Sequence, residues 1–516
     1  MHGHTSSPAE FLMKRKVSQY PLPLLPKPPN VHSRHWLRDS IRQAILSGML
    51  GPGQRLPATR ELARLYHLSR GTVLTAIEDL KSEGYLSGLQ GSGTFVTQLL
   101  PDTLLQSQIP TPNLQIVKAD ERPRLSDFGK RLRPFRYFIN LAAPAFRPNL
   151  PAINLFPTTL WAQIASRRLH RASSTDLLGS EGRGYAPLRN VLAEYLRASR
   201  GVRCEPKQIV IVSGVQESID LAARILVNPG ERVMLEDPGY HVAYDVFHAL
   251  GACIESVPID ESAAAPSGRQ FRDAKLLYVT PGHQFPTGTT MPVKRRIEIL
   301  HKARESGTLI FEDDFDSEYR YSGSPIPAMQ GIDKNDLVIF AGSFNKVLFP
   351  SLRMGYIVLP EALVEPFVRA KTMINRHHSI LDQAIVCDFL EQGHFGRHLR
   401  RMRKIYAERL EALTYHVEKR LAGALTLSPI EAGLQTVGWL KAGLIGEEVS
   451  VAAAARNVDV VALSRYCHKR RLAEGIQLGF AAVDENAIEK GVLGLADAID
   501  GLSRRSPRSA AVSATE

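Results

Sequence analysis

The chain has few cysteines and no long apolar run, and both absences limit what it can be. Its 516 residues include four cysteines, which lie far apart and form no CxxC pair: Cys204, Cys253, Cys387 and Cys467. This spacing favours buried thiols in a reducing compartment and argues against a zinc site. No stretch reaches membrane-spanning length, and residues 1–16 lack the apolar core of a signal sequence. We therefore expect a cytoplasmic protein without membrane contacts.

Neither hydrophobic residues, at 44%, nor aromatic residues, at 7%, are depleted, so the composition is that of an ordinary globular protein. A chain of this length exceeds one ordinary core and predicts two or three domains. The formal net charge of +12 favours a polyanionic partner, but only weakly in so large a protein.

Composition and periodicity divide the chain into a short N-terminal domain and a long C-terminal region. Residues 1–33 are polar and then rich in proline, and residues 503–516 are polar, so we expect a disordered arm and a disordered tail. Residues 98–137 combine mixed charge, several prolines and little periodicity, which is typical of a linker. The domains predicted between these segments are 34–97, 138–360 and a smaller C-terminal subdomain at 361–502.

Three helical segments followed by two short strands make up the first domain. Apolar residues recur at helical spacing from Arg34 to Leu50, Thr59 is a good N-cap for a second helix, and Ser69 caps a third. The residues from Tyr85 to Val96 alternate as two strands around a glycine-rich turn. This order predicts a winged helix-turn-helix.

The run LPATRELARLYHLSRGTVLTAIEDLKSEGYLSGLQGSGTFV closely resembles the DNA-binding domain of GntR-type regulators. The resemblance implies that the domain binds a double-stranded DNA operator, with Arg60 and Arg70 matching the DNA-contacting arginines of the family. Ordinary surface charge is the alternative for both. Further contacts are predicted at the off-stripe positions of the third helix and at the wing tip: Ser69, Thr72, Thr75, Gln90, Gly91 and Gly93.

In the long C-terminal region, strand-like runs alternate with helical segments. Nearly continuous apolar runs begin at Gln208, Arg232, Lys275, Thr308 and Asp336. Such strands, separated by helices, predict an α/β fold with a mostly parallel sheet covered on both faces. Ligands of such sheets bind beyond the carboxyl ends of the strands, so the residues that end each run are the candidate site residues. The sequence pattern of the C-terminal subdomain predicts an α+β fold.

Lys346 lies in the run AGSFNKVLFPSLRMGYIVL, in a small-residue turn between two strand-like segments. A lysine held there, with Ser343 before it and Arg353 after it, suits a Schiff-base nucleophile beside a phosphate site. A solvated loop lysine is the ordinary alternative. The segment resembles the cofactor lysine region of fold-type I, aspartate-aminotransferase-like proteins. This resemblance implies that the chain binds pyridoxal 5′-phosphate through Lys346.

Other strand ends match further parts of a pyridoxal phosphate site. Asp313 directly follows an apolar run, and a carboxylate at the ring nitrogen keeps the pyridine protonated. Asp316 and Glu318, just beyond it, read as solvated acids. Tyr240 matches the aromatic residue that stacks on the ring, with core packing as the alternative. The resemblance adds the remaining cofactor contacts: Ser343, Arg353, His283 in TPGHQFPTG, and Gly214, Val215 and Gln216, whose backbone amides begin a helix.

Three positions depart from the fold-type I pattern. Phe315 stands where the family usually has a tyrosine that donates to the ring 3-oxygen. The stretch LLGSEGRGYAPLR lacks the tyrosine often found near Gly179, which reaches across the dimer in aminotransferases. Gln477, in IQLGFA, replaces the arginine that binds the substrate carboxylate in catalytic aminotransferases and in GABA-sensing members. Loss of that charge-assisted contact is worth roughly 1.5–3 kcal/mol to a carboxylate ligand.

A GntR-type winged helix ahead of an aminotransferase-like domain is the layout of MocR/GabR-type transcriptional regulators, which the chain resembles from about residue 34 to 500. The resemblance implies a transcription factor that senses a small amine, amino acid or vitamin B6-related effector. It also implies a head-to-tail, domain-swapped homodimer. The alternative is a working aminotransferase with an accessory DNA-binding domain. Phe315 and Gln477 argue against it and predict, at most, slow transaminase or half-transamination activity. An enzyme that has lost the cofactor is disfavoured by the presence of Lys346.

Overall fold

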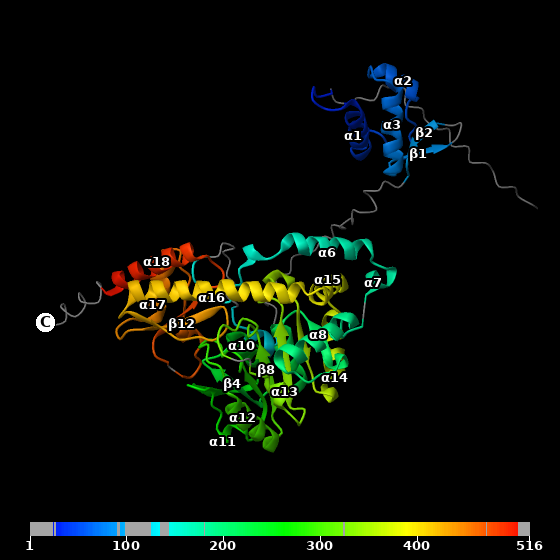
Figure 1. The fold of residues 1–516 in the computed structure, drawn as a ribbon. Coiled ribbons are helices and arrows are strands. Elements are labelled where there is room, and N and C mark those ends of the chain that lie inside the picture. The colour runs from blue at the N-terminus through cyan, green and yellow to red at the C-terminus, as the bar shows by residue number, and fades with distance from the viewer. Residues whose placement is uncertain are drawn as a thin grey trace, which may run out of the picture. The chain divides into compact units, whose positions relative to one another are not determined.

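The computed structural model describes residues 24, 27–89, 93–98, 125–134, 144–179, 181–323, 326–470 and 472–503. The chain forms two compact units that meet in sequence between Arg122 and Pro123. Figure 1 shows the elements of both.

The N-terminal unit is the predicted winged helix-turn-helix. Its elements are α1 (Ser33–Leu46), α2 (Thr59–Leu65), α3 (Arg70–Ser82), β1 (Leu86–Leu89) and β2 (Gly93–Val96). The two strands pair antiparallel and form the wing. The predicted cap of α2 was wrong by one residue. Leu62 N–H donates to Ala58 O at 3.0 Å, so the intrahelical bonding already starts at Ala58 and Thr59 is the first helical residue.

The third helix of this unit buries one face and exposes the other. Val73, Ala76, Ile77 and Leu80 are buried in a core shared with α1. At its N-terminus the Ser69 hydroxyl accepts from the Thr72 N–H at 3.1 Å, which satisfies a backbone donor that has no partner within the helix. The remaining face of α3 is therefore available to a ligand of this unit.

The C-terminal unit is built on an eight-stranded sheet in the order β3-β10-β9-β8-β7-β4-β5-β6. The strands are β3 (Ile209–Val212), β4 (Arg232–Asp237), β5 (Cys253–Asp260), β6 (Ala263–Ala264), β7 (Ala274–Val279), β8 (Leu309–Asp314), β9 (Val338–Ser343) and β10 (Gly355–Val358). The five strands from β9 to β5 in this order are parallel. β10 runs antiparallel to both of its neighbours, and β6 runs antiparallel to β5. The mostly parallel sheet is thus confirmed, and it has two additional strands, β5 and, at the edge, β6.

Helices cover both faces of this sheet because its strands are apolar on both. Side chains of α9, α10 and α14 pack on one face, and those of α12 and α13 pack on the other. The helices of this layer are α8 (Ala186–Arg200), α9 (Val215–Leu226), α10 (His241–Ala249), α11 (Gly268–Phe271), α12 (Val293–Ser306), α13 (Met329–Ile332) and α14 (Glu361–Asn375). Three further helices, α6 (Thr158–His170), α7 (Ser174–Leu178) and α15 (Ile380–Glu391), complete the region, and α6 packs against α15.

A short helix, α5 (Asp127–Arg131), lies within the range that the sequence predicts as a linker. The Ser126 hydroxyl accepts from the Gly129 N–H at 3.1 Å and so caps its first turn. The helix contacts α10. Part of the range 98–137 is therefore folded onto the C-terminal unit.

The C-terminal subdomain has the expected α+β composition. Its four-stranded antiparallel sheet has the order β11-β12-β14-β13, and α16 lies beside α18 across it (Figure 1). The elements are α16 (His394–Leu421), β11 (Leu425–Leu427), β12 (Gln435–Leu440), α17 (Gly446–Ala454), β13 (Val461–Ala462), β14 (Gly475–Gly479) and α18 (Glu485–Ser503). Among the helices of the described residues, none is both long and apolar enough to cross a membrane.

A buried ion pair holds the carboxyl end of β8 in place. The Arg200 guanidinium at the end of α8 donates to both Asp314 oxygens, at 2.7 and 2.8 Å. Both side chains are less than a tenth exposed, at 7% and 4%. Because successive side chains of a strand point to opposite faces, this contact fixes the neighbouring Asp313 on the other face.

Candidate functional site

A cavity of about 320 Å³ lies at the carboxyl ends of β7, β8 and β9, and the N-termini of α9 and α10 also border it. Every cofactor residue predicted from the sequence lines this cavity except His283. Those that do are Gly214, Val215, Gln216, Tyr240, Asp313, Ser343, Lys346 and Arg353. Residues that lie well over a hundred positions apart in sequence thus meet because parallel strands end at one edge of the sheet.

Lys346 follows β9 and points its amine into this cavity. The Lys346 Nζ donates to the backbone oxygen of Asn149 at 2.8 Å. Burial lowers the pKa of Lys346 to about 8, although Asp316 and Asp313 act in the opposite direction. A lowered pKa increases the fraction of neutral amine near neutral pH, and the neutral amine is the nucleophilic form.

Asp313, at the end of β8, offers a buried acceptor to the cavity. The Tyr278 hydroxyl donates to its Oδ2 at 2.6 Å, whereas Oδ1 has no hydrogen-bond partner among the described residues. Desolvation raises the pKa of Asp313 to about 7, against the Tyr278 hydrogen bond and with the help of the Asp314 and Glu236 charges. An unpartnered buried oxygen of this kind fits a ligand that brings its own N–H donor.

Positive charge lines the cavity where α9 begins. Gly214 is the N-cap of α9, with a φ of 143° that favours glycine. The amides that follow have no partner within the helix, and a helix N-terminus attracts anions. Ser343 and Arg353 line the same cavity, and an arginine can hold a phosphate with two parallel hydrogen bonds. This group of residues suits a phosphate.

Aromatic rings form one wall of the cavity. Tyr240, at the N-terminus of α10, packs edge-to-face against Phe285 with ring centroids 5.6 Å apart. Phe285 packs in the same way against Phe315, at 5.9 Å. Neither phenylalanine carries a hydroxyl, so both present only an apolar surface to a ligand.

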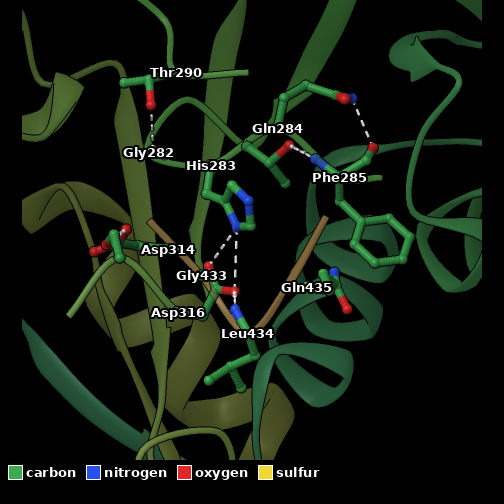
Figure 2. Close-up of polar contacts among 12 residues, drawn as sticks. Gly282, His283, Gln284, Phe285, Thr290, Asp314, Asp316, Gly433, Leu434 and Gln435 are labelled. Carbon is green, nitrogen blue, oxygen red and sulfur yellow. Dashed lines mark hydrogen bonds and ion pairs between the residues drawn. The ribbon is translucent and has the colours of Figure 1, made fainter. Parts of the chain in front are cut away.

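His283 lies outside the cavity, in a buried acidic cluster. Its Nδ1 is 2.9 Å from Asp316 Oδ1, and the Leu434 N–H donates to Asp316 Oδ2 at 3.3 Å (Figure 2). The interpretation of Asp316 and Glu318 as solvated acids was wrong, since they are 1% and 7% exposed. The chain turns inward after β8, where His283 and the β12 region supply partners for Asp316.

Gln477 is also buried away from the cavity. Its Oε1 accepts from the Tyr466 hydroxyl at 2.8 Å, and its Nε2 has no partner among the described residues. Tyr466 packs against Phe285 with ring centroids 5.0 Å apart. The structure therefore does not bring Gln477 to the cofactor cavity, and Tyr466 covers its carbonyl oxygen.

The predicted DNA contacts lie on the N-terminal unit. Arg60 and Arg70 are exposed, and neither guanidinium has a hydrogen bond or ion pair within the described part of the chain. The hydroxyls of α3 bond locally: those of Ser69 and Thr72 are 2.8 Å apart, and Thr75 donates to Gly71 O at 2.9 Å. Gln90 and Gly91 lie outside the described residues. Gly93 has a φ of 108°, and a Cβ there would lie 2.7 Å from Arg55 Nε.

The sequence analysis did not identify several residues of the two sites. Arg55 lies against the wing, Tyr278 holds Asp313, and Asn345 accepts from the Met354 N–H at 3.1 Å beside Lys346. Of these residues, only Tyr278 could have been identified from the sequence, because it lies in the strand that precedes the strand of Asp313. Asn149 contributes a backbone oxygen from a left-handed conformation, with a φ of 65°, which no side-chain pattern reveals.

Comparison with known families and proteins gives concordant matches. Residues 36–96 match the family of bacterial regulatory proteins called the gntR family, and residues 152–493 match the aminotransferase class I and II family. The chain is 37% identical to the probable rhizopine catabolism regulatory protein MocR of Rhizobium meliloti, over 92% of this chain and 95% of that protein. It is 30% identical to the pyridoxine biosynthesis transcriptional regulator PdxR of Corynebacterium glutamicum, over 90% of this chain and 95% of that protein.

Among solved structures, the C-terminal unit is similar to LysN, the alpha-aminoadipate aminotransferase of Thermus thermophilus. That crystal structure contains N-(5′-phosphopyridoxyl)-L-leucine. The match has a TM-score of 0.64 at 29% identity and covers 70% of this chain and 92% of LysN.

The raised pKa of Asp313 makes a prediction for the cofactor-free protein. Between its ordinary pKa of 3.8 and about 7, the folded state keeps a proton that the unfolded chain releases. This residue therefore favours folding less as pH rises through that window. We expect Asp313→Asn to gain stability relative to the parent between about pH 5 and pH 8, on the order of 1–3 kcal/mol.

Urea unfolding at both pH values measures this difference, with Asp497→Asn, at an exposed position of α18, as the matched control. A stability difference for Asp313→Asn that stays constant with pH would show that the carboxyl titrates normally.

Proposed function

The chain belongs to the MocR/GabR-type family of transcriptional regulators, and we propose that it is one whose C-terminal unit binds pyridoxal 5′-phosphate in the cavity around Lys346. A small-molecule effector beside the cofactor would then control operator binding by the winged helix. The observation that carries the proposal is Asp313 Oδ1, which has no hydrogen-bond partner among the described residues and shares one cavity with the amine of Lys346.

The donor set of the cavity fits the three functional parts of this cofactor. Lys346 suits its aldehyde, Asp313 its ring nitrogen, and Arg353 with Ser343 and the α9 N-terminus its phosphate. When bound, the cofactor supplies an electron-withdrawing ring and an aldehyde that reacts with primary amines.

The side chains and backbone of the protein bind and orient the cofactor. The lowered pKa of Lys346 provides a neutral amine, and the Asn149 backbone oxygen orients it. The raised pKa of Asp313 falls when a protonated ring nitrogen approaches, because an opposite charge favours the carboxylate. Tyr240 and Phe285 keep water from one side of the ring. These tasks are binding and orientation, which a sensor needs as much as an enzyme does.

For DNA recognition we infer that Arg60 and Arg70 meet the operator, together with the wing. Their guanidinium groups are exposed and unpaired in the described structure, so DNA contact breaks no internal ion pair. Arg55 lies beside Gly93 of the wing and is an additional candidate. An arginine at these positions can contact either a base or a phosphate.

The effector proposed is a small amine, an amino acid or a vitamin B6-related compound. Relatives named for rhizopine catabolism and pyridoxine biosynthesis support a small-molecule signal. A working aminotransferase is the weaker alternative, because Phe315 has no hydroxyl for the ring 3-oxygen and Gln477 is sealed behind Tyr466. We infer at most slow transaminase or half-transamination activity.

A homodimer, head-to-tail and domain-swapped, is also proposed. An exposed apolar surface on the C-terminal unit supports association. α7 and the end of α14 lie close together, since a Cβ at Gly179 would lie 2.4 Å from His377 Nε2. Around this contact, the side chains that are more than half exposed are Leu177, Leu178, Met373 and Ile374. Such a surface is unusual on a monomer.

Replacing the proposed cofactor lysine tests the cofactor directly. We expect the parent protein with pyridoxal 5′-phosphate to absorb visible light and to retain the cofactor covalently after borohydride reduction. Lys346→Ala should lose both signals and still fold, whereas Lys302→Ala, whose amine bonds the Pro266 backbone oxygen at 3.0 Å, should keep both. A reducible covalent adduct in Lys346→Ala would remove Lys346 from the proposal.

Operator binding tests the winged helix. Because phosphate neutralisation dominates such interfaces, binding should weaken steeply with salt. Arg70→Ala should weaken specific binding by roughly 1–3 kcal/mol if the arginine reads a base. Arg420→Ala, which removes an exposed charge from the other unit, is the control. An Arg70→Ala protein with an unchanged footprint and affinity would take Arg70 off the reading surface.

A further inference from the structure

Residues 125–134, which we term the docked segment, fold onto the C-terminal unit although they lie in the predicted linker. The Arg131 guanidinium donates to the backbone oxygen of Ala249, the last residue of α10, at 3.4 Å. The fit is close, because a Cβ at Gly251 would lie 2.7 Å from the same guanidinium nitrogen. The end of the linker is thus placed at the C-terminus of α10.

Three further side-chain contacts extend this docking. The Arg224 guanidinium, in the last turn of α9, lies 5.5 Å from the centre of the Phe128 ring. The Arg133 guanidinium lies 4.9 Å from the centre of the Tyr244 ring in α10 and 3.9 Å from Asp245. The docked segment therefore touches both α9 and α10.

The same two helices border the cofactor cavity at their N-terminal ends. α9 begins at the proposed phosphate site with Val215 and Gln216, and α10 begins with His241 and Val242, directly after Tyr240. Each helix is continuous between the two contacts. A ligand that orders the N-terminal ends of α9 and α10 therefore acts on the helices that carry the docked segment.

A second cavity, of about 1090 Å³, links the cofactor cavity more directly with the docked segment. It shares Asn149 and His241 with the cofactor cavity, and Arg133 and Pro134 of the docked segment form part of its wall. The Nδ1 atom of His241 is buried and has no partner in the described structure. A ligand that extends past Lys346 toward His241 enters a space bounded by the docked segment.

The docking contacts are individually weak. The Arg133 and Asp245 side chains are 49% and 33% exposed, and solvent screens such a pair. The Arg131 hydrogen bond is long. An equilibrium held by a few weak contacts is one that a bound ligand can shift, provided that the ligand favours one of the two states.

We propose that the docked segment is the intramolecular contact through which the cofactor cavity acts on the linker that precedes it in sequence. Occupation of the cavity strengthens docking on α9 and α10, and thereby restrains the chain where it enters the C-terminal unit. This inference rests on the proposed function for its ligand, but the docking surface itself stands on the contacts above.

Hydrogen exchange of the full-length protein tests the docking. In the absence of cofactor, amides of residues 127–133 should exchange more slowly than those of an unfolded peptide. Addition of pyridoxal 5′-phosphate should slow them further, by roughly threefold or more. Exchange at the unfolded rate, with and without cofactor, would overturn the proposal.

Variants of the docked segment separate coupling from cofactor binding. Phe128→Ala and Arg133→Ala should each accelerate exchange of the segment by roughly two- to tenfold and leave the cofactor absorbance unchanged. Lys130→Ala is the matched control on the same helix, because Lys130 pairs with Asp127 of that helix at 3.1 Å and is 64% exposed. Equal exchange in Phe128→Ala, Arg133→Ala and the control would contradict the contact assignment.

Operator affinity provides the second readout. The ratio of operator dissociation constants with and without pyridoxal 5′-phosphate should move toward one in Phe128→Ala and Arg133→Ala, and should stay at the parent value in Lys130→Ala. A parental ratio in the docking variants would refute the coupling. A parent protein that shows no cofactor absorbance at all would instead refute the proposed function, while its exchange without cofactor would still test the docked segment.

Discussion

The site depends on acidic side chains that the fold holds out of water at the carboxyl end of β8. Burial raises the pKa of Asp313 to about 7, and it raises that of the neighbouring Glu318 likewise. Such groups are tolerated only where cations or donors compensate them. Arg200 compensates Asp314 and His283 contacts Asp316, but one oxygen of Asp313 has no partner in the part of the chain that the structure describes. The sheet edge thus offers a buried acceptor to a ligand that brings its own donor.

This arrangement also explains how an aminotransferase-like unit serves a regulator. The groups that suit the phosphate, the ring nitrogen and the aldehyde all line one cavity. Two positions lack the polar groups of a catalytic aminotransferase: Phe315 lines the cavity but has no hydroxyl, and Gln477 lies outside the cavity, where its Oε1 accepts from the Tyr466 hydroxyl. Poor alignment costs an enzyme rate, whereas a sensor requires only that its ligand favour one conformation.

The two units differ in how their charged side chains are paired. Among the described residues, Arg60 and Arg70 have no hydrogen-bond or ion-pair partner, so their charge is free for a polyanion. Near the cavity of the C-terminal unit, Arg200 pairs with Asp314 and His283 contacts Asp316. α9 and α10 reach from that cavity to the docked segment, so the docked segment belongs to the C-terminal unit.

Local patterns in the sequence were sufficient for the winged helix, the mostly parallel sheet and the set of strand ends that carry Lys346, Asp313 and Arg353. Periodicity and capping depend on neighbouring residues, and parallel strands bring their carboxyl ends to one edge. Only the tertiary structure decided that His283 turns to Asp316, that Gln477 is covered by Tyr466, and that Asn149 presents its backbone oxygen to Lys346. The same holds for the docking of α5 on α10. Each of these contacts joins residues distant in sequence, and their geometry follows from packing, which no local pattern encodes.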